Sequence, residues 1–289
     1  MNSHLKGLIV TTLGVLFIVP DSLFVRLIDA EPMVIAFWRG MTSGLIILLA
    51  VSAFQGLKGF SAVLRTGWAG AIYALLIALT TPGFVLAITK TSVANVVFIF
   101  ATTPIFAAMF SRAFLGEPIR MRMVLTMIVV LVGLGIIAYG TGSTEIASWQ
   151  GDLWALFVAM AYAGALTAVR KVRDMTIIPA IPIAYVGAAL VIGSFTSPVP
   201  AFAAQWPLFL GHGAFIGVAT CLLTLGPRYL SAAEVALLIL LESVLAPLLV
   251  WAVIGEDPGP WALVGGAVVI GALLLSNLWA LWMHRRERS

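Results

Sequence analysis

Residues 92–118 read Ser92-Val-Ala-Asn-Val-Val-Phe-Ile-Phe-Ala-Thr-Thr-Pro-Ile-Phe-Ala-Ala-Met-Phe-Ser-Arg-Ala-Phe-Leu-Gly-Glu-Pro118, a long apolar stretch with a polar centre. Its outline returns near the other end of the chain at a constant offset of 139 residues. An outline used twice indicates internal duplication, and in a membrane protein it favours a transporter built from repeats. The equivalent pairs are Ser92 and Ser231, Ala94 and Ala233, Val96 and Val235, Gly116 and Gly255, and Glu117 and Glu256.

The composition indicates a membrane protein. The 289 residues are 62% hydrophobic and only 10% charged, with a mean hydropathy of +1.11. A soluble domain usually carries about 25% charged residues, so this chain has too little polar surface for a water-soluble fold. The net charge of +4 does not by itself indicate nucleic acid, because cytoplasmic loops of membrane proteins collect Lys and Arg. We therefore expect a lipid bilayer, not a nucleic acid, around this chain.

The same residues argue against several other classes. Cys221 is the one cysteine, so neither an intrachain disulfide nor a cysteine-based metal site is expected. The three histidines, His4, His212 and His284, are scattered and predict no metal cluster. We find no Ser/His/Asp set for catalysis and no nucleotide-binding loop, so the sequence predicts neither an enzyme nor a bound cofactor.

Hydropathy predicts ten membrane-spanning helices. A helix needs about 20 apolar residues to cross the hydrocarbon core. The first apolar stretch is too long for the core of a signal peptide, so it is expected to remain as the first span. The predicted spans are 5–28, 32–54, 68–90, 93–115, 121–140, 150–170, 179–196, 206–227, 231–254 and 260–283.

The distribution of basic residues predicts the topology. If both termini are cytoplasmic, 13 of the 16 Lys and Arg residues fall on the inside, as the positive-inside rule requires. Residues 1–141 and 149–289 then form two halves of five spans each. Because five is odd, the halves are inverted repeats, which usually place a substrate site at their interface. The inside residues are Lys6, Lys58, Arg65, Arg112, Arg120, Arg122, Arg170, Lys171, Arg173, Arg228, Arg285, Arg286 and Arg288.

The motifs resemble those of a known family. They are Ser92-Val-Ala-Asn-Val96 running to Gly116-Glu117-Pro118, Ser231-Ala-Ala-Glu-Val235 running to Gly255-Glu256, Phe37-Trp38-Arg39, and Gly151-Asp152-Leu153. Over nearly its whole length the chain resembles the EamA-type transporters of the drug/metabolite transporter superfamily. The resemblance implies an all-α bundle of ten transmembrane helices around a central cavity. It also implies secondary transport of small metabolites, often amino-acid export, across the bacterial inner membrane.

The chain departs from this family in one place. Family members often carry a proline at the centre of both long helices. Here Pro104 aligns at the offset of 139 residues with Ser243, and the proline of the second half is Pro247, four residues later. We therefore do not expect strict two-fold symmetry at the centre.

Three charged residues inside predicted spans are candidates for substrate binding. A charge at the bilayer centre costs about 2.5–3.5 kcal/mol on insertion scales and usually has a function. Asp21 and Arg39 lie at similar depth in neighbouring antiparallel spans, so they are expected to pair. The alternative is an ion pair that only locks the two helices together, since pairing removes much of the cost of burial.

Glu242 lies near the middle of the ninth predicted span, with no basic residue one helical turn away. A carboxyl at this depth could bind a proton or a cationic group; the alternative is a protonated or hydrogen-bonded structural residue. Glu234 is different, because Ser231-x-x-Glu234 has the spacing of a capping box. Structural capping is the favoured interpretation of Glu234.

Polar and proline residues at the span centres complete the predicted site. Proline removes a backbone donor and frees a carbonyl one turn earlier, and neighbouring threonines can reuse that carbonyl. Such centres predict kinked helices around a polar cavity, although threonine often bonds only to its own helix. The predicted substrate-binding residues here are Thr80, Thr81, Thr102, Thr103, Tyr162 and Ser243, and the predicted hinges are Pro82, Pro104 and Pro247.

The sequence thus predicts a secondary transporter of a small polar metabolite, most simply an amino-acid exporter working by alternating access. Asp21, Arg39 and Glu242 would recognise the charged ends of the substrate, and protons could drive it. A rival is a carrier of cationic or quaternary-amine compounds, with Glu242 and aromatic residues as its site. A channel is the third alternative.

Overall fold

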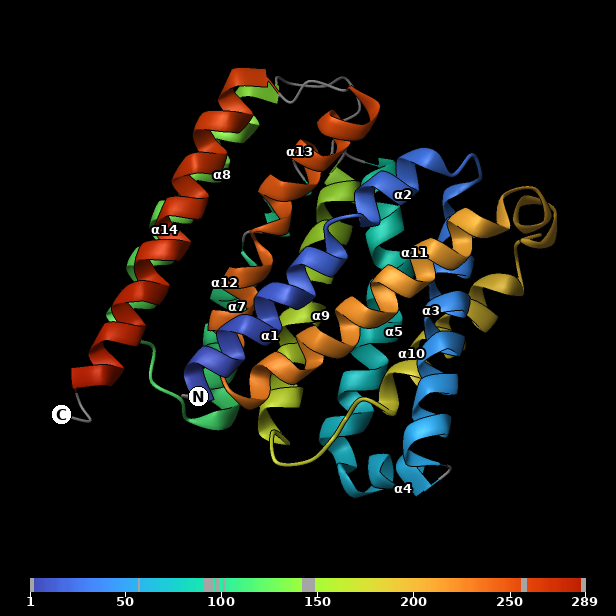
Figure 1. Cartoon of the computed structure of the whole chain (residues 1–289), viewed down its shortest axis with the longest axis horizontal. Coiled ribbons are helices and arrows are strands. Elements are labelled where there is room, and N and C mark those ends of the chain that lie inside the picture. The colour runs from blue at the N-terminus through green and yellow to red at the C-terminus, as the bar shows by residue number, and fades with distance from the viewer. Residues whose placement is uncertain are drawn as a thin grey trace.

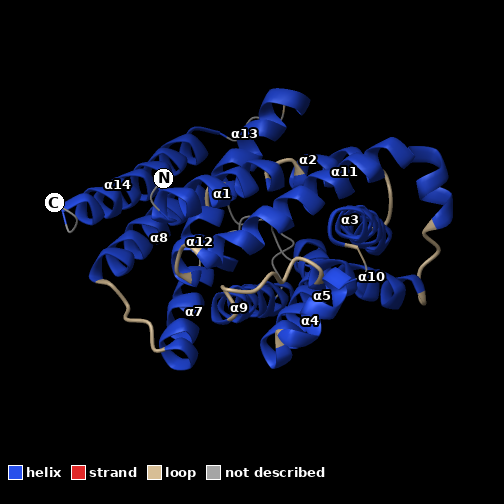
Figure 2. Ribbon diagram, turned by 60° about the horizontal axis from the view of Figure 1, so that its bottom comes forward, coloured by secondary structure: helices blue, strands red, loops and turns tan. Residues whose placement is uncertain are grey.

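A computed structural model describes residues 3–56, 58–90, 96, 99–100, 102–141, 149–255 and 259–286. In these ranges the regular structure is entirely helical, and the helices pack as one bundle (Figures 1 and 2). The elements are α1 (Ser3–Ile18), α2 (Asp21–Leu27), α3 (Pro32–Gln55), α4 (Lys58–Arg65), α5 (Gly67–Lys90), α7 (Thr103–Phe110), the π-helix η1 (Ser111–Leu115), α8 (Met121–Thr141), α9 (Trp149–Lys171), α10 (Ala180–Gly193), α11 (Val199–Leu225), the 3-10 helix η2 (Gly226–Arg228), α12 (Ala232–Ile239), α13 (Glu242–Ile254) and α14 (Gly259–Arg286).

Apolar helices occupy every one of the ten predicted segments. Six of them, within the described residues, are long and apolar enough to cross a membrane. Four further segments are shorter apolar helices: Thr103–Leu115, Met121–Ile136, Ala180–Gly193 and Leu263–Ser276. The structure therefore supports an all-helical membrane protein, and the count of ten spans stays a prediction.

Two of the membrane-spanning segments are broken near their centres. The first changes from α1 to α2 at Val19–Pro20, where proline cannot donate to the preceding turn. The ninth changes from α12 to α13 at Leu240–Leu241, where Ser243 N–H bonds three residues back, to Leu240, as in a 3-10 turn. Asp21 and Glu242 are the first residues of the helices that follow these breaks, a position that favours an acidic side chain.

The three predicted hinge prolines lie in different settings. Helix α5 runs through Pro82 without interruption, and Pro104 stands at the start of α7. Pro247 lies inside α13, because the break in that segment comes earlier, at Leu240–Leu241. Whether any of the three acts as a hinge stays a prediction.

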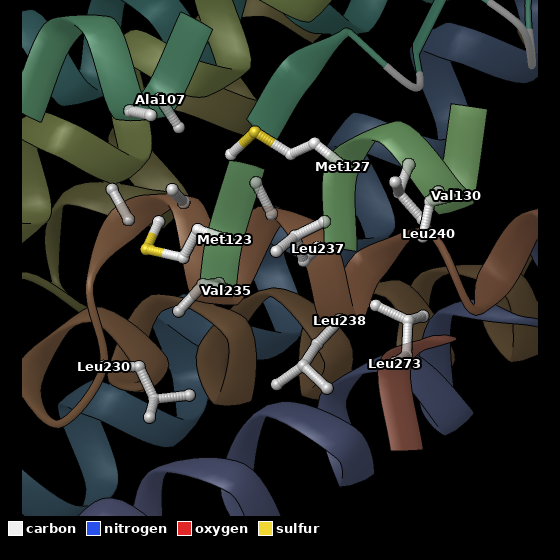
Figure 3. Packing of buried hydrophobic residues seen from close by; sticks show 14 of the residues in the cluster. Ala107, Met123, Met127, Val130, Leu230, Val235, Leu237, Leu238, Leu240 and Leu273 are labelled. Carbon is white, nitrogen blue, oxygen red and sulfur yellow. The ribbon is translucent and has the colours of Figure 1, made fainter. Parts of the chain in front are cut away.

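Helix α12 lies at the centre of the largest apolar core. It packs against α7, α8 and α9, and α8 in turn lies along α14 on one side of the bundle (Figure 1). Met123 and Met127 of α8 lie beside Leu237 of α12, and Leu238 of α12 and Leu273 of α14 belong to the same core (Figure 3). Since α8 precedes residue 142 and α12 follows it, this core joins the two predicted halves.

Close helix crossings depend on glycine. A methyl group built on Gly213 of α11 would lie 2.0 Å from Thr42 Oγ1 and 2.9 Å from Ser43 N of α3. One built on Gly133 of α8 would lie 3.0 Å from the Gly265 carbonyl oxygen of α14. Small residues of this kind let membrane helices approach closely. The crossing at Gly213 has a direct consequence for the site, because His212 is its neighbour.

Candidate substrate site

A buried ion pair joins the first broken segment to α3. Arg39 Nη2 lies 2.7 Å from Asp21 Oδ2, and Arg39 Nε lies 3.2 Å from Asp21 Oδ1. The Asp21 side chain is 5% exposed and that of Arg39 is 14% exposed. The pair predicted from the sequence is therefore present, with the two-pronged geometry that suits a guanidinium and a carboxylate.

His212 of α11 completes this cluster from the other half of the chain. Its Nε2 lies 2.5 Å from Asp21 Oδ1, and the residue is fully buried. The ring of Phe24 stacks against it with centroids 5.3 Å apart. If Asp21 is ionised, Nε2 must be the donor, and in a neutral ring Nδ1 then holds the lone pair. Nδ1 has no hydrogen-bond partner among the described residues.

Glu242 lies near this cluster, because α13 packs against α2. Its carboxylate interacts electrostatically with both Asp21 and Arg39. It forms neither a hydrogen bond nor an ion pair with the residues that the structure describes. Together Asp21, Arg39, His212 and Glu242 form what we call the central charge cluster, to which each half of the chain contributes two residues.

A small chamber, which we call the central chamber, lies beside the central charge cluster, and both apolar side chains and hydroxyl-bearing side chains line it. The hydroxyls of Tyr73 and Thr224 lie 2.8 Å apart, and those of Tyr185 and Thr220 are also 2.8 Å apart. Tyr162 lines the cavity between these helices and interacts electrostatically with Glu242 and Arg39. The cavity has a volume of about 10 Å³, which is room for one water molecule at most.

The predicted threonines bond mainly within their own segments. Thr80 Oγ1 donates to the Ile77 carbonyl, and Thr102 Oγ1 donates to the Ile99 carbonyl. Thr81 and Thr103 are buried, and the Thr81 hydroxyl has no partner among the described residues. Ser243 is half-buried beside Glu242. A substrate-binding role for these residues stays a prediction.

The far end of the bundle holds a second set of charges. We call it the arginine-rich end and define it by Arg120, Arg122, Arg170, Arg173 and Arg228. Glu117 Oε1 accepts from Arg170 Nε at 2.8 Å, and Glu234 Oε1 accepts from Arg122 Nη2 at 2.5 Å. Each ion pair links a residue before position 142 to one after position 148.

The predicted capping box is present at this end. Ser231 Oγ accepts from the Glu234 N–H at 3.3 Å, and Glu234 Oε2 accepts from the Ser231 N–H at 3.1 Å. Both hydrogen bonds of the motif are therefore formed, as the Ser-x-x-Glu spacing indicates. Glu234 combines this cap with its ion pair to Arg122, so the contacts expected from the capping interpretation are present.

Sequence reasoning missed His212. It stands in the apolar run Leu-Phe-Leu-Gly-His-Gly-Ala-Phe at residues 208–215, where any ionisable side chain is a functional candidate. This rule for ionisable side chains in apolar runs was enough to select His212 as a candidate, but it does not show that Asp21 is the partner of His212. His212 and Asp21 are 191 positions apart, and only packing of α11 against α2 brings them together.

Comparison with known proteins identifies the family. A protein-family model described as the EamA-like transporter family matches residues 5–139 and 149–278. The chain belongs to the EamA-like transporter family. The two matches correspond to the two halves, so this EamA-like chain is a membrane transporter of the drug/metabolite transporter superfamily. The resemblance seen in the motifs is confirmed.

Two other comparisons complete this finding. A solved structure described as "Crystal structure of protein" has a TM-score of 0.80 and 18% sequence identity, and the match covers 100% of both chains. At that identity the similarity shows that the EamA-like chain shares its fold. A search of curated proteins finds no match.

Proposed function

We propose that this EamA-like transporter is a secondary carrier of small zwitterionic metabolites, amino acids or related compounds. One observation carries the proposal, namely that the central charge cluster is buried at the contact between the two halves. Asp21 and Arg39 come from the first half, while His212 and Glu242 come from the second. Carriers built from inverted repeats bind their substrates at such an interface, near the bilayer midplane.

The chemistry of the cluster suits a substrate with charges of both signs. Glu242 has no ion-pair partner among the described residues, so it can accept a substrate ammonium. Arg39 already binds Asp21 and is the cationic group within reach of a substrate carboxylate. A carboxyl group without a partner inside a membrane span is expensive, which favours a role in binding over a role in packing.

Alternating access is the mechanism that we propose for this carrier. The chamber beside the central charge cluster has room for about one water molecule, so a substrate can enter it only after the helices around it move apart. Breaks next to Asp21 and Glu242 divide two segments into halves that could tilt separately.

We further propose export from the bacterial cytoplasm, with both termini cytoplasmic. The gathering of arginines at one end supports that orientation, because basic residues concentrate on the cytoplasmic side.

Uptake by proteoliposomes tests this proposal. The purified chain is reconstituted, and radiolabelled amino acids and amines are supplied with and without an imposed pH gradient. We expect saturable uptake of amino acids, and Glu242→Gln should lower it at least tenfold. Glu31→Gln is the matched control, because Glu31 is an exposed carboxylate at the start of α3. Normal uptake by Glu242→Gln would remove this residue from the site.

A carrier of organic cations is the second candidate. It is favoured by Glu242, whose carboxylate has no partner among the described residues, and by Tyr162 nearby. Saturable uptake of quaternary amines but not of amino acids would support this candidate and overturn the first. Uptake that neither saturates nor shows counterflow would indicate a channel.

A further inference from the structure

A second cavity lies at the arginine-rich end of the bundle. It has a volume of about 320 Å³, within the size range of small-molecule sites, roughly 300–1,000 Å³. Its walls come from the start of α1, the end of α7, η1 and the turn after it, the start of α8, the end of α9 and the start of α12. It does not share a lining residue with the central chamber. Both halves of the chain contribute to it.

The π-helix η1 shapes one wall of this cavity. It winds Ser111–Leu115 more widely than an α-helix and ends at Gly116, whose φ of +68° suits glycine. The Glu117 N–H then donates back to the Ser111 carbonyl at 3.2 Å. This closed turn holds Ser111 and Glu117 together, and both line the cavity.

Two buried polar atoms on this wall have no hydrogen-bond partner among the described residues. They are Ser111 Oγ and Glu117 Oε2. Ser111 is 3% exposed, and the other oxygen of Glu117 is already bound by Arg170. A buried acceptor without a donor is costly, more so when it is charged. The pair of atoms therefore suits a ligand that brings hydrogen-bond donors, above all an ammonium group.

The lining of the same cavity also includes a cation. Arg120 lines it, is exposed, and forms no ion pair with the described part of the chain. A guanidinium in this state can bind a carboxylate through two parallel hydrogen bonds. The cavity thus offers an acceptor for an ammonium and a donor for a carboxylate within one small volume.

We propose that this cavity is an entrance site that binds a small zwitterion of the amino-acid class before it reaches the central charge cluster. The ammonium binds Glu117 and Ser111, and the carboxylate binds Arg120. This inference rests on the proposed function for the order of the two sites, although its chemistry stands on the cavity alone. Because Arg170 holds the other oxygen of Glu117, the ligand binds beside an ion pair that joins the two halves.

Thiol protection tests the entrance site directly. Cys221 is the one cysteine of the chain, so Cys221→Ala removes the background. Ile119→Cys then places an accessible thiol on the cavity wall, at a residue that is not one of the proposed ligands, and its alkylation by a small maleimide is timed in lipid nanodiscs. We expect saturating L-alanine to slow labelling at least fivefold, and methylammonium or acetate alone to protect much less.

Further substitutions make the test specific. Glu117→Gln or Arg120→Gln should raise the half-protecting concentration of L-alanine at least tenfold. Arg112→Gln is the matched control, since Arg112 is an exposed arginine on η1 that does not line the cavity. Equal protection in Glu117→Gln, or no protection in the parent, would overturn the inference. A thiol that the maleimide does not label at all would also overturn the inference, because the cavity would then be closed to small molecules.

The experiment separates this inference from the proposed function. Protection is measured without transport, and Glu242→Gln should leave it unchanged because Glu242 does not line this cavity. Protection without uptake of any amino acid would sustain the entrance site and reject the carrier proposal. Uptake of L-alanine without protection would reject the entrance site and leave the carrier proposal intact.

Discussion

The carboxylate of Asp21 and the imidazole of His212 lie 2.5 Å apart, although 191 positions separate them in the sequence. They come from different halves of the chain, and the Asp21 carboxylate also binds Arg39 of its own half. One carboxylate thus connects a guanidinium from one repeat with an imidazole from the other. Any opening between the halves at this point must break a charged hydrogen bond.

Removing the imidazole should weaken the fold at this contact. We expect His212→Leu to lower stability by about 1.5–3 kcal/mol, the usual contribution of a hydrogen bond to a charged group. His212→Gln keeps a donor for Asp21 and should lose less. The midpoint of thermal unfolding in detergent measures both. Equal losses in the two variants would show that the contact with Asp21 contributes little.

The Asp21–Arg39 pair should behave as a coupled unit. Removing one partner leaves the other charge buried, so Asp21→Asn and Arg39→Gln should each cost about 3–5 kcal/mol. The double variant should cost clearly less than the sum of the two, because neither charge is then left alone. Thermal unfolding of the four proteins gives the coupling. Additive losses would argue against a direct interaction.

A methyl group at position 213 should push α11 away from α3. Gly213→Ala places the new carbon against Thr42 and Ser43, so we expect a loss of about 1–3 kcal/mol from overpacking. Gly187→Ala is the matched control, because open space surrounds a methyl group on that glycine of α10. Thermal unfolding should separate the two variants. Uptake should also fall in Gly213→Ala, since His212 moves with its neighbour.

The capping box should contribute measurably to stability. Ser231→Ala removes the side chain that accepts from Glu234 N–H, and we expect a loss of about 0.5–2 kcal/mol. Ser194→Ala, at an exposed serine after α10, should change stability little. Comparable unfolding midpoints for both variants would mean that the start of α12 is held by packing alone.

Much of the fold and part of the site could be predicted from local patterns. The duplicated outline and hydropathy located the helical segments, because a membrane span needs a run of apolar residues. The Asp21–Arg39 pair followed from equal depth in neighbouring antiparallel spans. The capping box followed from its spacing alone. Each of these depends on residues close in sequence or in adjacent elements.

Other features depend on tertiary packing and could not be found in this way. The break at Val19–Pro20 follows a proline that the sequence displays, whereas the break at Leu240–Leu241 precedes Pro247 by more than a turn. The partnership of His212 with Asp21 requires α11 to lie against α2. The π-helical winding of Ser111–Leu115 has no counterpart in the residue spacing, since both long segments reach their glycines over equal lengths.

That winding makes the two repeats unequal where their sequences are matched. Residues 250–254 precede Gly255 as regular α-helix, while Ser111–Leu115 precede Gly116 as π-helix, although both glycines end their segments in the left-handed region. A transporter made of two identical inverted halves would have the same opening to its substrate pathway on each side of the membrane. Here the half-saturating substrate concentration can differ between the two faces. The ratio of substrate concentrations across the membrane at equilibrium does not depend on this difference, because the winding of a helix supplies no driving force for transport.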